Sequence, residues 1–191
     1  MALNANETII KAAGDVYRAA LGTGAPSEED LTDSGALVSA GFVHMGWLHE
    51  DGPSFDGFEG EVQRFNGWNR QAPVRVRSII GEPTVTVPLT QWNVENASLY
   101  FPGSEVDIAS GNLVVPSTPG TAIEQELLVV VQDGSESFGF WAAKTSPRPG
   151  GPLEFPGDDF SQIQVTFDVL APDSDEDGLV QIIGLDEAES S

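Results

Sequence analysis

The residues closest to a known chemical site are the aspartates Asp173, Asp175 and Asp177, followed by Gly178. Calcium loops use this D-x-D-x-D-G spacing to place three carboxylates around one cation, with glycine at the sharp turn. The twelfth position of such a loop is normally a bidentate glutamate, but here it is Gly184. Because no helix pattern flanks the segment, we interpret it as a solvated acidic tail and keep the three aspartates only as metal candidates.

The two histidines, His44 and His49, are the other candidates for catalysis or metal binding. They are five residues apart, and a strand places residues at that spacing on opposite faces. We therefore interpret both as surface or partly buried polar side chains and expect no shared metal and no serine–histidine relay. The chain has no cysteine, which excludes disulfides, thiolate metal sites and cysteine nucleophiles. The sequence predicts no enzyme and no cofactor.

Length and charge define the class of protein in which these residues lie. The 191 residues include 30 acidic and 8 basic ones, for a formal net charge of −22. Such a charge repels nucleic-acid phosphates, while a hydrophobic content of 40% is too high for a disordered acidic chain. The aliphatic run Leu127–Val131 is far shorter than the roughly 20 residues of a membrane span, and no secretory signal is visible. We expect a soluble, intracellular protein with one domain at residues 1–171 and an acidic tail at residues 172–191.

Glycines and prolines interrupt the chain about every ten residues, with short β-rich runs between them, which favours an all-β sandwich or barrel. Two pairs of strands are predicted to form hairpins, one around residues 133–136 and one around residues 81–83. The predicted strands are Asp15–Leu21, Gly41–Leu48, Val74–Ile80, Thr84–Gln91, Gln125–Gln132, Ser137–Lys144 and Ile163–Leu170.

The sequence predicts one short helix, over Asn93–Phe101, with its first residue as the N-cap. A shorter helical turn is expected at Ser27–Asp30, which resembles a capping box. Two long stretches, Gly22–Ala40 and Glu50–Pro73, have no regular pattern, and loops of that length are usually functional or disordered. The acidic tail holds one apolar patch, Leu179–Ile183, which could add a strand or bind a partner.

Aromatic and basic residues gather in the middle of the chain. Trp47 and Trp92 are expected in the core between two sheets, whereas Phe65 and Trp68 lie in a polar stretch where an exposed aromatic indicates a partner surface. Four of the eight basic residues fall in the same region, and they complement the acidic surface of another copy. This pattern indicates head-to-tail self-association. The candidate self-assembly residues are Arg64, Phe65, Trp68, Arg70, Arg75, Arg77, Thr84 and Thr86.

Five segments, taken in order, carry a likeness to one family. They are Ala13–Ala20, Gly46–Phe55 (a G-aromatic-x-x-E-D-G step), Trp68–Arg75 (W-x-x-x-x-P-V-R), Thr84–Gln91 followed by Asn93–Phe101, and Asp158–Leu170. Over roughly residues 8–171, the chain resembles the major tail tube proteins of bacteriophages with long, non-contractile tails (siphophages), especially those of actinobacterial hosts.

The resemblance implies a mainly β fold, an antiparallel β-sandwich or partial barrel with one short helix, whose edges pair between subunits into a large β-barrel ring. It implies hexameric rings stacked into the virion's hollow tail tube, assembled in the host cytoplasm, which conducts the genome during ejection. The implied partners are other copies of the chain and the tape-measure, tail-terminator and tail-tip proteins; the DNA passes without specific binding, and no membrane is involved. Glu50–Pro73 is the candidate for ring stacking and Val74–Gln91 for the inner barrel. As a hypothesis, a negative bore repels the DNA backbone so that the genome slides freely.

Two other interpretations stay open. One is a monomeric β-sandwich module that binds carbohydrate or protein through Phe65, Trp68 and Trp92, with calcium at Asp173–Asp177. The other is a tail-terminator or head-decoration protein, which would form rings or trimers but no extended tube.

Overall fold

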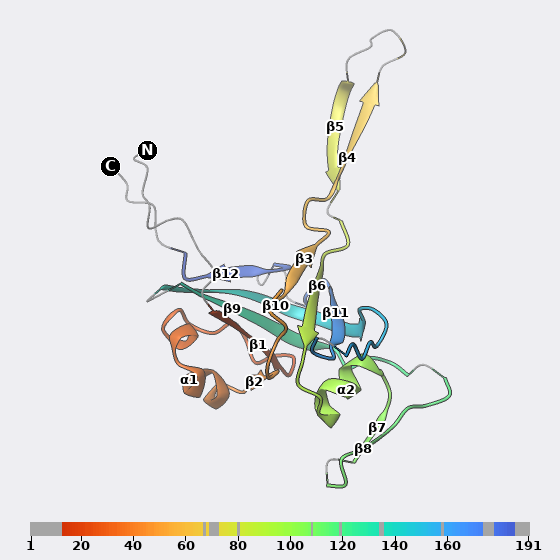
Figure 1. Ribbon diagram of the computed structural model, residues 1–191. Helices are drawn as coiled ribbons and strands as arrows, with labels where there is room; N and C mark the ends of the chain where they lie inside the picture. Colours follow the sequence, from red (N-terminus) through yellow and green to blue (C-terminus); the bar gives the residue numbers. More distant parts are fainter. Residues whose placement is uncertain are drawn as a thin grey trace.

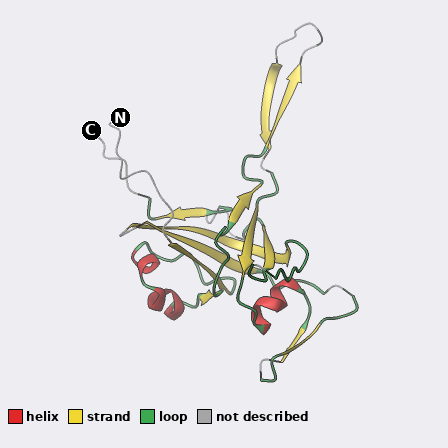
Figure 2. Ribbon diagram, in the orientation of Figure 1, coloured by secondary structure: helices red, strands yellow, loops and turns green. Residues whose placement is uncertain are grey.

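The structure is a computed structural model that describes residues 13–66, 68, 73–79, 81–107, 109–118, 120–133, 136–157, 159–173 and 178–185. Its body is one eight-stranded sheet in the order β2-β1-β9-β10-β11-β6-β3, with β12 paired to β10 (Figure 1). Two small sheets, β4-β5 and β7-β8, project from opposite sides of the body (Figure 2). Every strand pair is antiparallel, and within the described residues the large sheet does not close into a barrel. The expectation of a mainly β, antiparallel protein is therefore confirmed.

The strands of the body are β1 (Ala13–Ala19), β2 (Val43–His44), β3 (Ser54–Asp56), β6 (Thr84–Leu89), β9 (Gln125–Asp133), β10 (Glu136–Pro149), β11 (Ile163–Val169) and β12 (Gln181–Ile183). The projecting strands are β4 (Glu61–Asn66), β5 (Pro73–Ile79), β7 (Glu105–Asp107) and β8 (Asn112–Val114). The helices are the 3-10 helix η2 (Glu29–Thr32), α1 (Ser34–Ser39) and α2 (Val94–Tyr100).

Strand β10 is where the large sheet bends. Its first half pairs with β9 and β12, its second half pairs with β11, and the register to β9 shifts between Ala142 and Thr145. A bulge of this kind bends a strand and increases its twist. As a result, β6 and β11 turn back over β1 and β9, and apolar residues from one face of each of the four strands share a core with Leu99 and Tyr100 of α2.

Two separate cores explain the aliphatic run in β9. Leu127 and Val129 face the core shared with β6 and β11, whereas Leu128 and Val130 face a second core. The second core is covered by η2 and α1, which contribute residues such as Leu31. Because side chains alternate along a strand, burial on both faces requires an unbroken apolar run.

Helix α2 begins where the sequence predicts. The Asn93 side chain accepts a hydrogen bond from the Asn96 amide at 2.7 Å, as an N-cap does. The Asn96 side chain, buried below the helix, donates to the carbonyls of Met45 and Gln91 and so attaches α2 to the sheet. The turn at Ser27 is also confirmed by hydrogen bonds to the Asp30 carboxylate. The structure adds α1, so the prediction of a single short helix is wrong.

The predicted hairpin around residues 81–83 is wrong, since β5 pairs with β4, and β6 pairs with β11 and β3. The inward residues of β6 are fully buried, whereas the described side chains of β5 are exposed or half-exposed. Two stretches expected to be irregular contain regular elements. Residues 22–40 contain η2 and α1, and residues 50–73 contain β3 and β4. The predicted strand Gly41–Leu48 is a strand only at Val43–His44.

The tryptophans also differ from expectation. Trp47 is 79% exposed and Trp92 is 43% exposed, so neither is a core residue, and the buried tryptophan is Trp141. Trp92 instead stacks on Phe155, with ring centroids 5.1 Å apart. At the other end of the chain, the apolar patch of the acidic tail adds a strand, because β12 pairs with β10 and buries Ile183.

Candidate self-assembly surface

The hairpin of β4 and β5, here called the arm, extends away from the body (Figure 1). No described strand of the body pairs with it. A two-stranded hairpin without a third strand or a covering helix is at best marginally stable in water. A partner that covered the arm would therefore stabilise it.

The strand register divides the arm into two faces. Directly paired residues of antiparallel strands share a face, so Phe65 lies beside Arg75, and Gln63 lies beside Arg77, on one face. The opposite face pairs Arg64 with Val76. The aromatic and cationic groups of the first face, together with the valines and Arg64 of the second, match the composition of a partner surface.

The arm is also the place where positive charge is left unpaired. On the body, Arg18, Lys144 and Arg148 each lie within 3.2 Å of a carboxylate oxygen. Within the described residues, the three arginines of the arm have no ion pair. In a chain of net charge −22, these three side chains can attract a carboxylate surface on another molecule.

The structure brings together most of the predicted self-assembly residues. Trp68, just beyond β4, is fully exposed, and Phe65 is 50% exposed. Thr84 and Thr86 lie apart from them, in the body, where Thr86 Oγ1 hydrogen-bonds Thr166 Oγ1 at 2.8 Å. Arg70 lies outside the described residues.

The metal and histidine candidates that the structure describes have ordinary partners. Asp173 accepts a hydrogen bond from Lys144 at 3.0 Å, and this bond, followed by the one to Glu124, raises the pKa of Lys144 above its usual value. Asp175 and Asp177 lie outside the described residues. Within the described part of the chain, no group of three or more histidine or carboxylate side chains could hold a metal ion.

Each histidine contacts a carboxylate of its own. His44 Nε2 lies 3.0 Å from Asp15 Oδ1, and the His44 and Tyr17 rings form a T-shaped pair with centroids 4.9 Å apart. Burial, with a smaller contribution from Asp15, raises the pKa of Tyr17. The nearly buried His49 lies 2.9 Å from Asp51 Oδ2. These contacts attach the β2 region to its neighbours. Both histidines line one cavity of about 470 Å³, but each has a separate carboxylate partner there.

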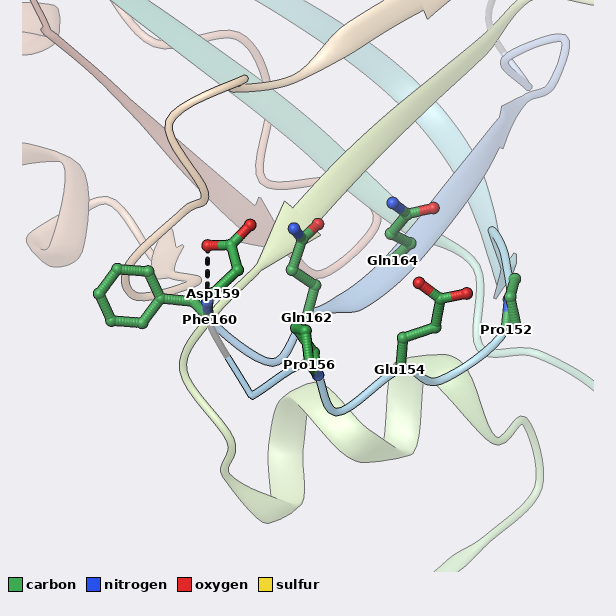
Figure 3. Close-up of a pocket in the computed structure, with 7 residues that line it drawn as sticks. All are labelled: Pro152, Glu154, Pro156, Asp159, Phe160, Gln162 and Gln164. Atoms are coloured by element: carbon green, nitrogen blue, oxygen red, sulfur yellow. Dashed lines mark hydrogen bonds between the residues drawn. The ribbon is translucent and has the colours of Figure 1, made fainter.

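The sequence did not single out a groove of about 550 Å³ at the start of β11 (Figure 3). Glu154 rises from the preceding loop, beside Gln162 and Gln164, and all three point to the same side. The Phe160 ring is 72% exposed at one end. The described lining, here called the groove, contains no basic residue and consists of Pro152, Glu154, Pro156, Asp159, Phe160, Gln162 and Gln164.

Contacts with α2 and with Trp92, just before its N-cap, hold the loop of the groove in place. The Tyr100 hydroxyl donates to the Gly151 carbonyl, and Trp92 Nε1 donates to the Ser161 carbonyl at 3.2 Å. The stacking of Trp92 on Phe155 adds a third contact. The only sequence signal for this groove is the segment 150–160, rich in proline, glycine and phenylalanine.

A mainly β body with an unpartnered cationic arm is a feature of proteins that assemble through their surfaces. The chain belongs to the phage tail tube protein family, whose model matches residues 1–191. It is 31% identical over 184 residues to the major tail protein Gp23 of Mycobacterium phage L5, covering 89% of this chain and 88% of that protein. It is 30% identical to the protein of the same name in Mycobacterium phage D29, with the same coverage. The resemblance inferred from the sequence is thus confirmed, and the chain is a structural protein of the phage tail. No helix in the described residues is long and apolar enough to cross a membrane.

Proposed function

We propose that this chain is the repeating subunit of the tail tube, with six copies forming a ring and rings stacking into a hollow tube that conducts the genome. The observation that carries the proposal is the arm, a hairpin that, within the described part of the chain, has no third strand from the body and three arginines without an ion pair. Ring closure needs a heterologous contact around the axis, and stacking needs a second, open head-to-tail contact. The chain would then meet the tape-measure, tail-terminator and tail-tip proteins at particular positions along or at the ends of the tube.

The sheet edges support lateral pairing within a ring. The last strands are short: β2 has two residues and β3 has three. Strand β3 pairs with Thr84–Thr86, and residues 47–49 cover the far end of β6, where the His49 amide donates to the Pro88 carbonyl at 2.9 Å. Strand addition from a neighbour would therefore use the outer edges of β2 and β3. Glu50–Pro73 remains our candidate for ring stacking, extended by β5, which pairs with β4 in the arm. Of the range Val74–Gln91, this leaves β6 as the candidate for the inner barrel.

The net charge of −22 suits a conduit for DNA. Carboxylates facing the bore would repel the phosphate backbone, so that the genome slides without adhering. Neutralising bore-facing acids should then slow ejection from reconstituted phage, and unchanged ejection kinetics would contradict this part of the proposal.

The test is negative-stain electron microscopy of the purified protein, concentrated at moderate salt to screen its self-repulsion. We expect hollow tubes of uniform diameter built from stacked rings. Rings that never stack would favour a tail-terminator or head-decoration role. Monomers that remain single even with a tail-tip initiator complex present, and that are stabilised by calcium or a glycan, would favour a binding module.

A further inference from the structure

We infer that the groove is the docking site for the arm of a second copy of this chain. The contact deepens the proposed function and rests on it, because it would repeat along the tube axis from each ring to the next. The occupant is thus a cationic, aromatic β-hairpin. Three independent observations support this assignment: the positions of the two surfaces, their charges, and their exposed side chains.

The arm and the groove lie at opposite ends of β6. The arm precedes Thr84, which pairs with Asp168, whereas the groove lies at the other end of the ladder, where Leu89 pairs with Ile163. Figure 1 shows the arm on the opposite side of the body from α2, and Figure 3 shows the groove beside α2. An open head-to-tail contact requires its two complementary surfaces to lie at opposite ends of the subunit, and this pair meets that requirement.

The charges of the two surfaces are complementary. Arg75 and Arg77 lie on one face of the arm and have no ion pair within the described residues. In the groove, Glu154 is exposed and also has no ion pair or hydrogen bond through its side chain among the described residues. Asp159 adds a second carboxylate, 3.5 Å from His49 Nε2. A guanidinium entering the groove would gain a carboxylate partner, and Glu154 would gain a cation.

The uncharged side chains match as well. The exposed Phe160 ring, with Pro152 and Pro156, offers an apolar surface to Phe65 or Trp68 of the arm. The Gln162 and Gln164 side chains have no hydrogen bond among the described residues, so their amides can bond the open backbone edge of a hairpin. A volume of about 550 Å³ falls within the range of about 300–1,000 Å³ typical of ligand pockets, and thus admits several side chains.

A charge exchange tests the contact. Arg75→Glu with Arg77→Glu should raise the protein concentration needed for tube formation at least about tenfold, because carboxylates would then face carboxylates. Glu154→Arg with Gln162→Arg should do the same from the groove side. The combination of all four changes should restore most of the assembly. Thermal melting and circular dichroism of each unassembled variant confirm that the fold is intact.

A matched control is Glu29→Arg, an exposed glutamate of η2 without an ion pair in the described residues. It should neither weaken assembly on its own nor rescue the arm variant. Rescue by Glu29→Arg, or tube formation by the groove variant at the wild-type concentration, would overturn the inference.

The absence of cysteine permits a direct test of proximity. Gln63→Cys on the arm, combined with Gln162→Cys in the groove, should form a ladder of covalent oligomers when assembled tubes are treated with a short bis-maleimide. Gln63→Cys combined with Glu29→Cys should form none. Tubes that assemble normally but give no ladder with the groove cysteine would overturn the groove assignment and leave the proposed function standing. Failure of the unmodified protein to form tubes, even with an initiator complex, would overturn the proposed function and this inference with it.

Discussion

The buried carboxylate of Glu126 offers the most quantitative test of the fold. Glu126 lies in β9 and is only 2% exposed. Its Oε2 accepts a hydrogen bond from Trp141 Nε1 at 3.1 Å, and its carboxylate accepts another from the Gly24 amide at 3.1 Å. These bonds connect two central strands with the loop that follows β1. A buried carboxylate with few partners depends strongly on each of them.

A double-mutant cycle measures the bond between the two side chains. A hydrogen bond to a charged group contributes about 1.5–3 kcal/mol. Trp141→Phe also leaves a small cavity, so its total cost should be about 2–4 kcal/mol of unfolding free energy. Combining it with Glu126→Leu should cost about 1.5–3 kcal/mol less than the sum of the single effects, because the shared bond can be lost only once.

The assay is urea unfolding of unassembled protein, followed by far-ultraviolet circular dichroism. Trp92→Phe is the matched control, because its indole donates to a backbone carbonyl at an exposed site, and it should cost only about 0.5–1.5 kcal/mol. A coupling between Trp141 and Glu126 below about 0.5 kcal/mol would refute the reasoning, since the two residues would then act independently.

Three further predictions concern other elements. Asn93→Ala should lower the unfolding free energy by about 1 kcal/mol in urea titrations through loss of the N-cap, whereas Asn93→Asp should preserve it. Gly103→Ala should reduce the melting temperature more than Gly111→Ala. Both glycines have positive φ, but a Cβ on Gly103 would lie 2.5 Å from a glycine Cα across the loop, and one on Gly111 would meet nothing. The hydrogen bond to Asp173 is the largest cause of the raised pKa of Lys144. The contribution of the charged Lys144 to folding stability is therefore complete below its ordinary pKa of 10.5 and is lost as the pH rises through the raised pKa. In urea titrations, the difference in unfolding free energy between the wild type and Lys144→Met should therefore shrink at strongly alkaline pH. A difference that stays constant with pH would contradict this prediction.

The elements that could be predicted from the sequence are those whose local residues show a clear signal, such as an apolar run, strand alternation or a helix cap. The hairpin of β9 and β10 combines two apolar runs with a turn, and β11 alternates cleanly. Helix α2 has a side chain that caps it. In these segments local propensity and tertiary packing agree, so a single sequence is sufficient.

The arm and the groove could not be predicted in the same way. Both β5 and β6 alternate, but alternation does not show whether the apolar residues meet a core or another molecule. Val85 and Val87 of β6 are buried, whereas Val76 of β5 is 55% exposed. The loop of the groove is held by Trp92 and Tyr100 from a distant part of the chain, and such long-range contacts leave no local periodicity.

At the base of the arm, the two segments that connect it to the body lie close together. A Cβ added to Gly57 would lie 2.3 Å from the Glu82 carbonyl oxygen, and one added to Gly60 or Gly81 would lie 2.4 Å from another backbone oxygen. The two chain segments therefore approach backbone to backbone, which only glycine permits. This junction joins the arm to the body, and no described strand of the body pairs with the arm. The net charge of −22 makes copies of this chain repel one another. A surface that attracts another copy would therefore have to be small, cationic and held away from the acidic body. A hairpin joined to the body through glycines, whose arginines have no ion pair among the described residues, would meet these conditions.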